Sequence, residues 1–217
     1  HRTPRIHEAR GVSDLMEELP LIALPTEQTE RADAASNRRR ILEAATELFA
    51  ERGAACVSMQ DVARAAGVGM GTMYRRFGDR AGLTFALLGE RHRAFQEQLL
   101  RGAPPLGPGV PTAERLHAFG RARIALLDEG EAELLLTTAN AESATLRGPD
   151  AAYRTHLAVL LRQAVPSIDV DYAVSTLVMA FDARLHVHLR HEREWTLARI
   201  QDGWCALADA WLAAADR

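Results

Sequence analysis

The sequence predicts an all-α fold, with an N-terminal three-helix segment of helix-turn-helix type followed by a larger C-terminal helical region. Three observations lead to this fold class. Apolar residues recur at helical spacing along most of the chain. No stretch of useful length alternates between apolar and polar residues as a strand would. Ala and Leu are plentiful, and aromatic residues make up only 6% of the 217 residues, which favours helices over a sheet.

Composition narrows the class of protein further. The 47% hydrophobic and 25% charged content is ordinary for a globular chain, and no apolar run is long enough to span a membrane. Cys56 and Cys205 are far apart and form neither a metal-type cluster nor a disulfide framework, so we expect a reducing cytoplasm. All 26 basic residues are Arg, which we interpret mainly as the codon bias of a GC-rich bacterial genome.

The chain divides into three predicted parts. Residues 1–36 mix charges with a short apolar patch between Pro20 and Pro25, which predicts a flexible extension. Residues 37–83 form the three-helix segment, and residues 84–217 form the larger helical region. Residues 31–80 carry nine Arg against six acids, whereas residues 81–217 carry fourteen against seventeen. A basic segment joined to an acidic body suits a nucleic-acid-binding module attached to another domain.

Each early helix has recognisable start and stop signals. The first begins at Asn37, with an apolar stripe at Ile41, Leu42, Ala45, Leu48 and Phe49, and ends at Gly53. Ser58 and Asp61 suit a capping-box-like start of the second, with Val57 and Val62 as a hydrophobic staple, and Gly67 ends it.

The third helix runs from after Val68 to Phe77, with Gly78 as its end, and Asp79 caps a fourth helix that reaches about Leu100. The four prolines and three glycines of Gly102–Pro111 then interrupt the helical pattern. Further helices are predicted at about 112–128, 131–143, 150–165, 169–190 and 195–215.

Short helices joined by Gly-containing turns, with a basic third helix, are typical of a reader of the DNA major groove. On the third helix Met70, Met73 and Phe77 share one side, and Gly71, Thr72, Arg75 and Arg76 the other, with Tyr74 at the border. A helical hairpin with a solvated Arg face is the alternative that this pattern alone leaves open.

The segment resembles the tetracycline-repressor (TetR) family of regulators. The resemblance rests on Arg40–Ala45, Leu48–Gly53, Val57–Ala63, Ala66–Phe77 and Asp79–Leu83, about 45 consecutive residues. It implies an all-helical homodimer with a C-terminal ligand-binding and dimerisation domain. Such a dimer binds a palindromic operator in double-stranded DNA, usually as a repressor, and a small molecule releases it.

The resemblance also assigns DNA-binding positions. Thr72, Tyr74 and Arg76 match recognition-helix positions, Arg80 matches the basic start of the fourth helix, and Ser58, Met59 and Gln60 match the second helix start, whose N–H groups meet phosphate. Gly69, Met70 and Gly71 are less polar than is usual in the family. We keep Met70 as a candidate contact and expect base readout to rest more on Arg75 and Arg76.

Contacts from outside the third helix are a further expectation. Arg38, Arg39 and Arg40 precede or begin the first apolar stripe, where a basic arm could enter a neighbouring minor groove. The alternative is a solvated helix start that touches phosphates at most.

The last two helices, at about 169–190 and 195–215, are predicted to form a dimer interface. The last carries an apolar stripe with two tryptophans, comprising Leu197, Ile200, Trp204, Leu207, Ala208, Trp211 and Leu212. Large aromatic residues on an exposed terminal helix suggest burial against a partner. Plain intramolecular core is the alternative.

A pocket for a lipophilic effector is expected between the middle helices by resemblance. The candidates are side chains that share a face or interrupt apolar helices: Phe119, Arg123, Leu127, Thr138, Asn140, Tyr153, His156 and Asp182. Ion-paired or solvent-facing roles are the alternative for each. His186 and His188 point about 200° apart on a helix and cannot share one ion. His188 and His191 could share one, but no third ligand is evident, so no metal site is predicted and no cofactor is expected.

An enzyme is the rival class. The sequence contains no G-x-S-x-G, phosphate loop, H-E-x-x-H or Cys–His nucleophile signature. A regulator of the same fold that responds to a protein partner, or to no ligand, is a further alternative. The sequence therefore predicts a DNA-binding regulator and no catalytic residues.

Overall fold

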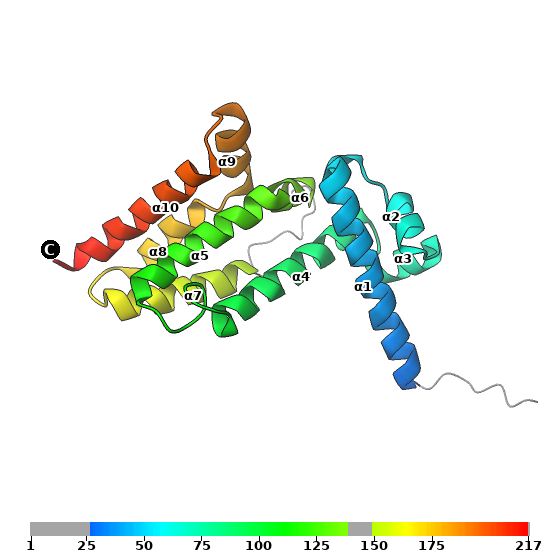
Figure 1. Ribbon diagram of the computed structural model, residues 1–217, viewed down its shortest axis with the longest axis horizontal. Coiled ribbons are helices and arrows are strands. Elements are labelled where there is room, and N and C mark those ends of the chain that lie inside the picture. The colour runs from blue at the N-terminus through cyan, green and yellow to red at the C-terminus, as the bar shows by residue number, and fades with distance from the viewer. Residues whose placement is uncertain (1–26, 139–148, 217) are drawn as a thin grey trace, which may run out of the picture. The chain divides into compact units, whose positions relative to one another are not determined.

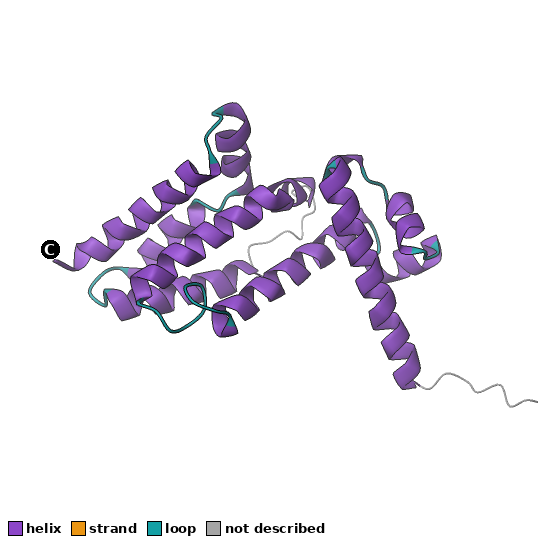
Figure 2. Cartoon of the chain, in the orientation of Figure 1, coloured by secondary structure: helices purple, strands orange, loops and turns teal. Residues whose placement is uncertain are grey.

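A computed structural model describes residues 27–138 and 149–216. Within these ranges every regular element is helical and no strand occurs (Figure 2). The all-α prediction is therefore confirmed. By its contacts the chain splits into two units, residues 1–36 and residues 37–217. Among the described residues, no helix combines the length and the apolar character needed to cross a bilayer.

Helix α1 spans Glu27–Arg52, so it begins ten residues before the predicted start at Asn37. Residues 27–36, which the sequence pattern assigned to the extension, are helical in the structure. This stretch is rich in Glu, Gln and Ala, which favour helix, and contains neither Pro nor Gly. It lacks an apolar stripe, and for that reason the sequence pattern suggested an extension.

The next three helices follow the predicted signals closely. A short turn, η1 (Ala54–Cys56), leads to α2 (Met59–Ala66), which Ser58 caps and the left-handed Gly67 ends. Helix α3 (Met70–Phe77) stops at Gly78. Helix α4 (Arg80–Arg101) begins after Asp79, whose side chain accepts a hydrogen bond from the backbone N–H of Gly82 at 2.8 Å.

Helix α5 (Thr112–Leu126) follows the Gly102–Pro111 loop. A wide turn, η2 (Leu127–Glu131), separates it from α6 (Ala132–Thr138). Within η2 the chain kinks at Gly130, whose φ of 90° is a conformation that side chains other than Gly rarely adopt. The predicted break between residues 128 and 131 is thus confirmed. Helix α7 (Pro149–Ala164) comes next.

The prediction of a single helix at 169–190 is wrong, because the structure has two helices in this range. Helix α8 spans Val170–Met179, and a second helix, α9, spans Ala183–Val187 and continues into the wide turn η3 (His188–Glu192). The break arises because the Asp182 side chain accepts from the N–H of Leu185 at 2.8 Å and caps α9. Helix α10 (Leu197–Leu212) and a short 3₁₀ turn, η4 (Ala213–Asp216), complete the described chain.

Two apolar cores hold the residue 37–217 unit together. The first joins α1 to α4 and takes in Leu134 of α6, and the second joins α5, α7, α8 and α10 with the end of α4. These latter helices pack side by side (Figure 1). Because α4 contributes Leu87 and Leu88 to the first core and Phe95 and Leu99 to the second, it is shared by both.

Candidate nucleic-acid interface and interior site

Helix α3 divides into a buried and an exposed side as predicted. Met73 and Phe77 are buried in the first core, which fixes the orientation of the helix. Gly71, Tyr74 and Arg75 are exposed on the other side. Tyr74 is 53% exposed and does not pack in either core, so its ring is available for contact with a partner molecule.

The other predicted residues of α3 are less free. Met70, Thr72 and Arg76 are half-buried, and Met70 packs against the first core. Met70 therefore supports the helix with much of its side chain. Thr72 and Arg76 remain candidates for contact through the part of each side chain that solvent reaches.

The start of α2 is fixed by a reciprocal cap. The N–H of Asp61 donates to Ser58 Oγ at 3.2 Å, and the N–H of Ser58 donates to Asp61 Oδ2 at 3.1 Å. The side-chain hydrogen bond from Ser58 is the main cause that lowers the pKa of Asp61. The side chain of Met59 is buried and that of Gln60 is exposed. Of these residues, Gln60 offers a side chain, while Met59 can offer only its backbone N–H.

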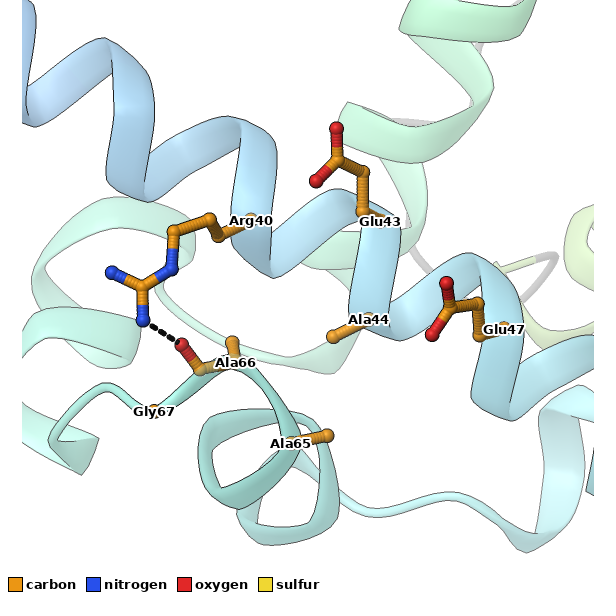
Figure 3. A pocket seen from close by; sticks show the side chains of 7 residues that line it. All are labelled: Arg40, Glu43, Ala44, Glu47, Ala65, Ala66 and Gly67. Atoms are coloured by element: carbon orange, nitrogen blue, oxygen red, sulfur yellow. Dashed lines mark hydrogen bonds between the residues drawn. The ribbon is translucent and has the colours of Figure 1, made fainter.

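Arg40, predicted as part of a basic arm, lies against the protein itself. Its Nη2 donates to the carbonyl oxygen of Ala66 at 2.6 Å, at the carboxyl end of α2 (Figure 3). The depression it closes is also lined by Glu43 and Glu47, two acids that repel phosphate. This arrangement gives Arg40 a structural role as a cap of α2.

Two further predicted DNA-binding arginines also have internal partners. The guanidinium of Arg38 lies over the Phe77 ring at 5.7 Å and pairs with Glu90 at 3.4 Å. Nη2 of Arg80 donates to the carbonyl oxygen of Ala54. By contrast, Arg39 is well exposed and pairs only loosely with Glu43, at 3.7 Å. Of the three arginines predicted to contact DNA, Arg38 and Arg40 thus have partners within the protein, while Arg39 and Arg40 are both exposed.

Five of the predicted ligand-binding residues gather in the second core. Phe119, Arg123 and Leu127 come from α5 and η2, and Tyr153 and His156 from α7. The Phe119 ring lies 5.8 Å from that of Tyr153 and 5.3 Å from that of His156. The guanidinium carbon of Arg123 is 5.4 Å from the centre of the Tyr153 ring. We refer to Phe119, Arg123, Tyr153 and His156 as the interior site.

The structure describes the side chain of only one of the three remaining predicted ligand contacts. Asp182 is exposed and caps α9, so its assignment to a pocket is wrong. Asn140 and the side chain of Thr138 lie outside the described residues.

The structure adds partners that the sequence reading missed. His92 of α4 and Glu131 of η2 join Arg123 in a buried network: Oε1 of Glu131 accepts from Arg123 Nη2 at 2.6 Å and contacts His92 Nε2 at 2.8 Å. The sequence did carry a signal, because a buried Arg inside an apolar stripe requires a buried acid. Glu131 directly follows the kink at Gly130.

The neighbours of Glu131 determine the protonation state of its carboxyl group. Burial by itself raises the pKa of the Glu131 carboxyl, but the hydrogen bond with His92 and the positive charge of Arg123 lower it by more. The net pKa of Glu131 lies below its usual value. The carboxylate is thus ionised at neutral pH and balances the buried guanidinium.

The apolar residues of α10 that were predicted to form a dimer interface are partly buried in the chain and partly exposed. Ile200 and Trp204 are buried within the chain, so their assignment to a dimer interface is wrong. Leu197 and Trp211 are half-buried, and Nε1 of Trp211 donates to Thr176 Oγ1 at 3.0 Å. Leu207 remains exposed.

Exposed apolar side chains occur on α10 and on α8, which packs against it. Small residues flank Leu207, namely Gly203, Ala206 and Ala210, all exposed. On α8, Tyr172 and Met179 are 61% and 71% exposed. Such apolar side chains on neighbouring helices form a surface that suits a second protein chain.

Within the described ranges, no three His, Cys, Asp or Glu side chains gather in a way that would hold a metal ion. His186 contacts Asp128 Oδ1 at 3.2 Å, and His188 contacts Glu192 Oε2 at 2.8 Å. Both histidines therefore have carboxylate partners of their own.

The helix-turn-helix segment matches a known family. The family model described as "Bacterial regulatory proteins, tetR family" covers residues 41–87. An HTH-type transcriptional regulator of Staphylococcus aureus is 47% identical over 58 residues. That match covers 27% of this chain and spans 31% of the length of the relative.

Similarity of fold extends over most of the chain. A TetR-family regulator from Rhodococcus sp. is 25% identical, with a TM-score of 0.61, and the match covers 82% of this chain and 99% of that one. A transcriptional regulator from Saccharomonospora viridis in complex with choline is 20% identical (TM-score 0.64, 81% and 96% covered). FadR from Bacillus subtilis in complex with stearoyl-CoA is also 20% identical (TM-score 0.59, 78% and 96% covered).

The matched residues include the candidate DNA-binding surface. The family model covers the capped α2, the exposed side of α3 and the start of α4. The solved structures are similar also in the helices that follow. Both the family model and the Staphylococcus aureus relative are described as regulators, in agreement with the regulator predicted from the sequence. Residues 41–87 thus match the TetR family of bacterial regulatory proteins, and the fold of the chain is similar to that of solved TetR-family regulators.

Proposed function

We propose that this protein is a transcriptional repressor that binds a palindromic operator as a homodimer and leaves it when a small molecule binds the α4–α10 body. The observation that carries the proposal is the exposed side of α3. Tyr74 and Arg75 project there from a helix that Met73 and Phe77 hold in place. Gln60, exposed at the start of α2, supplies a further polar contact.

Dimer formation is proposed through the exposed face of α8 and α10. Tyr172, Met179 and Leu207 are large apolar side chains without a core to cover them. Two copies related by a twofold axis would cover each other's patch and would present two α3 helices to the two half-sites of an operator.

A small effector is supported by the folds that this chain resembles. The regulators from Saccharomonospora viridis and Bacillus subtilis were solved with choline and stearoyl-CoA, which are molecules of different size and charge. The interior site of this chain occupies the helical body between α4, α5 and α7, where buried polar groups could orient such a molecule.

A gel-shift titration with the DNA upstream of the chain's own gene tests the proposal. We expect a sequence-dependent complex whose affinity falls steeply with salt. Arg75→Ala should weaken the complex about tenfold and relax its base preference, because the guanidinium is expected to contact base edges. Arg75 is exposed and does not pack in the core, so the change should leave the fold intact. The control is Arg101→Ala, which removes the same charge at the far end of α4. A complex equally tight with both variants contradicts the proposed interface.

A further inference from the structure

We infer that the interior site binds an anionic effector with an apolar body, that Arg123 receives its carboxylate, and that Glu131 conveys its presence to α4. The inference rests on the proposed function, since it names the ligand class and the signalling route of a ligand-released regulator. It starts from the side chains that the second core encloses.

Helix α5 presents two guanidinium groups on one face. Arg115, Phe119 and Arg123 are spaced at i, i+4 and i+8, so they follow one another along the same side of the helix. Arg123 is buried, and Arg115 donates to the carbonyl oxygen of Leu99 at 3.2 Å. Phe119, which is fully buried, lies on this face between them.

Helix α7 faces this surface with a neutral imidazole. The His156 ring packs against Phe119, and its Nε2 has no hydrogen-bond partner among the described residues. Burial, assisted by the charge of Arg115, lowers the pKa of His156 to about 4. At neutral pH the ring therefore carries no charge and can donate a hydrogen bond to an anion.

The aromatic rings of the site already hold a cation. The guanidinium carbon of Arg123 is 5.4 Å from the Tyr153 ring centre and 5.8 Å from that of Phe181. A quaternary ammonium ligand would seek the same ring faces and would be repelled by the guanidinium that occupies them. This arrangement argues against a cationic effector.

Arg123 retains hydrogen-bonding capacity that the chain does not use. Only 6% of its side chain is exposed, and Nη2 pairs with Glu131. Its Nε and Nη1 have no partner among the described residues. Buried donors without partners are costly, and a carboxylate accepts from a guanidinium through charge-assisted hydrogen bonds. An incoming carboxylate would satisfy these donors and would compete with Glu131 for the guanidinium.

Glu131 connects that competition to the DNA-binding half. Its Oε1 is shared between Arg123 of α5 and His92 of α4, and α4 begins at Arg80, directly after the helix-turn-helix segment. His92 also packs edge-on against Tyr153, with ring centres 5.7 Å apart. We infer that a ligand entering among these packed side chains displaces the Tyr153 ring and, with it, the His92 ring of α4 that packs against it. Competition for Arg123 and displacement of the Tyr153 ring both change the contacts of His92. Glu131 and His92 are therefore positioning residues, which link ligand binding to the release of DNA through α4.

Three probes of equal chain length test the ligand class: decanoate, decanol and decyltrimethylammonium, each below its micelle concentration. Calorimetry and thermal melting of the full-length protein measure binding, since a ligand of the folded state raises the melting temperature. We expect decanoate to bind about tenfold or more tightly than either of the others. Equal binding of decanoate and decanol, or tighter binding of the ammonium probe, overturns the inference.

Two variants assign the preference to Arg123. Arg123→Met combined with Glu131→Met removes the buried pair without leaving one charge alone, and it should bind decanoate no better than decanol. Arg121→Met, on the same helix but exposed and paired with Asp202, should keep the preference. A double variant that keeps it, with a cooperative melt to show that it is folded, excludes Arg123 as the receptor.

A third variant tests the signalling route. Glu131→Gln should still bind decanoate, yet decanoate should release less operator DNA from it than from the wild type in a gel shift. Equal release from both would remove Glu131 from the route. Operator binding without decanoate separates this result from failure of the proposed function. A protein that binds DNA but shows no carboxylate preference refutes the inference alone, and one that binds decanoate but no DNA refutes the regulator proposal.

Discussion

The six-membered ring of Trp204 in α10 lies directly against the backbone of Gly120 in α5, where a Cβ atom would overlap it. The other contacts of the indole fix its position. Its Nε1 donates to the carbonyl oxygen of Leu177 at 3.1 Å, and its rings stack on Phe181 with centres 5.6 Å apart. One side chain thus ties α10 to α5 and α8, which explains why it is core and not interface.

Replacement of Gly120 by Ala should destabilise the protein by about 1–3 kcal/mol, because the added methyl group forces the indole or a helix to shift. Gly89→Ala is the matched control. It is a helix-interior change with open space around the new Cβ, and it should stabilise by about 0.5–1 kcal/mol. Urea unfolding measures both changes. A stable Gly120→Ala protein would mean that α5 and α10 are less tightly packed than described.

Arg40→Ala should lower the free energy of unfolding by about 1 kcal/mol, since it removes the hydrogen bond to the carbonyl oxygen of Ala66. Arg39→Ala, which removes only a loose surface pair with Glu43, should cost less than about 0.5 kcal/mol. Urea unfolding of the two variants side by side tests the assignment of Arg40 as a cap. Equal losses would contradict it.

Stability should fall as the pH is lowered from 6.5 towards 4, in part through His156. Its pKa is about 4 in the folded chain against 6.5 for the free side chain, so the unfolded chain binds more protons in this window. Burial also lowers the pKa of His186, which contributes with the same sign. The test is to compare thermal melts of wild type and His156→Gln across this range. The variant should lose stability less steeply, and parallel curves would refute a role for His156.

Leu207→Glu should convert the proposed dimer into a monomer, because a charge at the centre of an apolar interface is left without a partner. Leu185 offers a control, since it is similarly exposed but lies on α9. Leu185→Glu should leave the oligomeric state unchanged. Sedimentation velocity of wild type and both variants decides the matter, and a Leu207→Glu dimer would place the interface elsewhere.

Local signals predicted the first half of the described chain well. Ser58, Gly67, Gly78 and Asp79 stand where α2 and α3 begin or end and where α4 starts. Caps and left-handed glycines act within one helical turn, so they can be recognised without knowledge of the rest of the fold. The same local reading missed the start of α1, because residues 27–36 form helix without an apolar stripe.

Side-chain partners far apart in sequence were less predictable. The sequence marked Arg123, Tyr153 and His156 as polar groups in apolar helices, but it could not pair Arg123 with Glu131 and His92. Those partners come from separate helices, and their meeting depends on the kink at Gly130 and on how α4 packs.

The sequence by itself determined the fold class, the helix-turn-helix segment and the resemblance of that segment to a family of regulators, because propensity, capping and motif spacing are local properties. Only the tertiary structure decided which arginines remain free to meet a partner and which tryptophan is core. The helical pattern places Arg40 and Trp204 on the surface, yet each contacts an element that is distant in sequence. Arg40 donates a hydrogen bond to the end of α2, and Trp204 packs against Gly120. Burial and hydrogen bonding depend on the packing of distant segments, which helical periodicity does not encode.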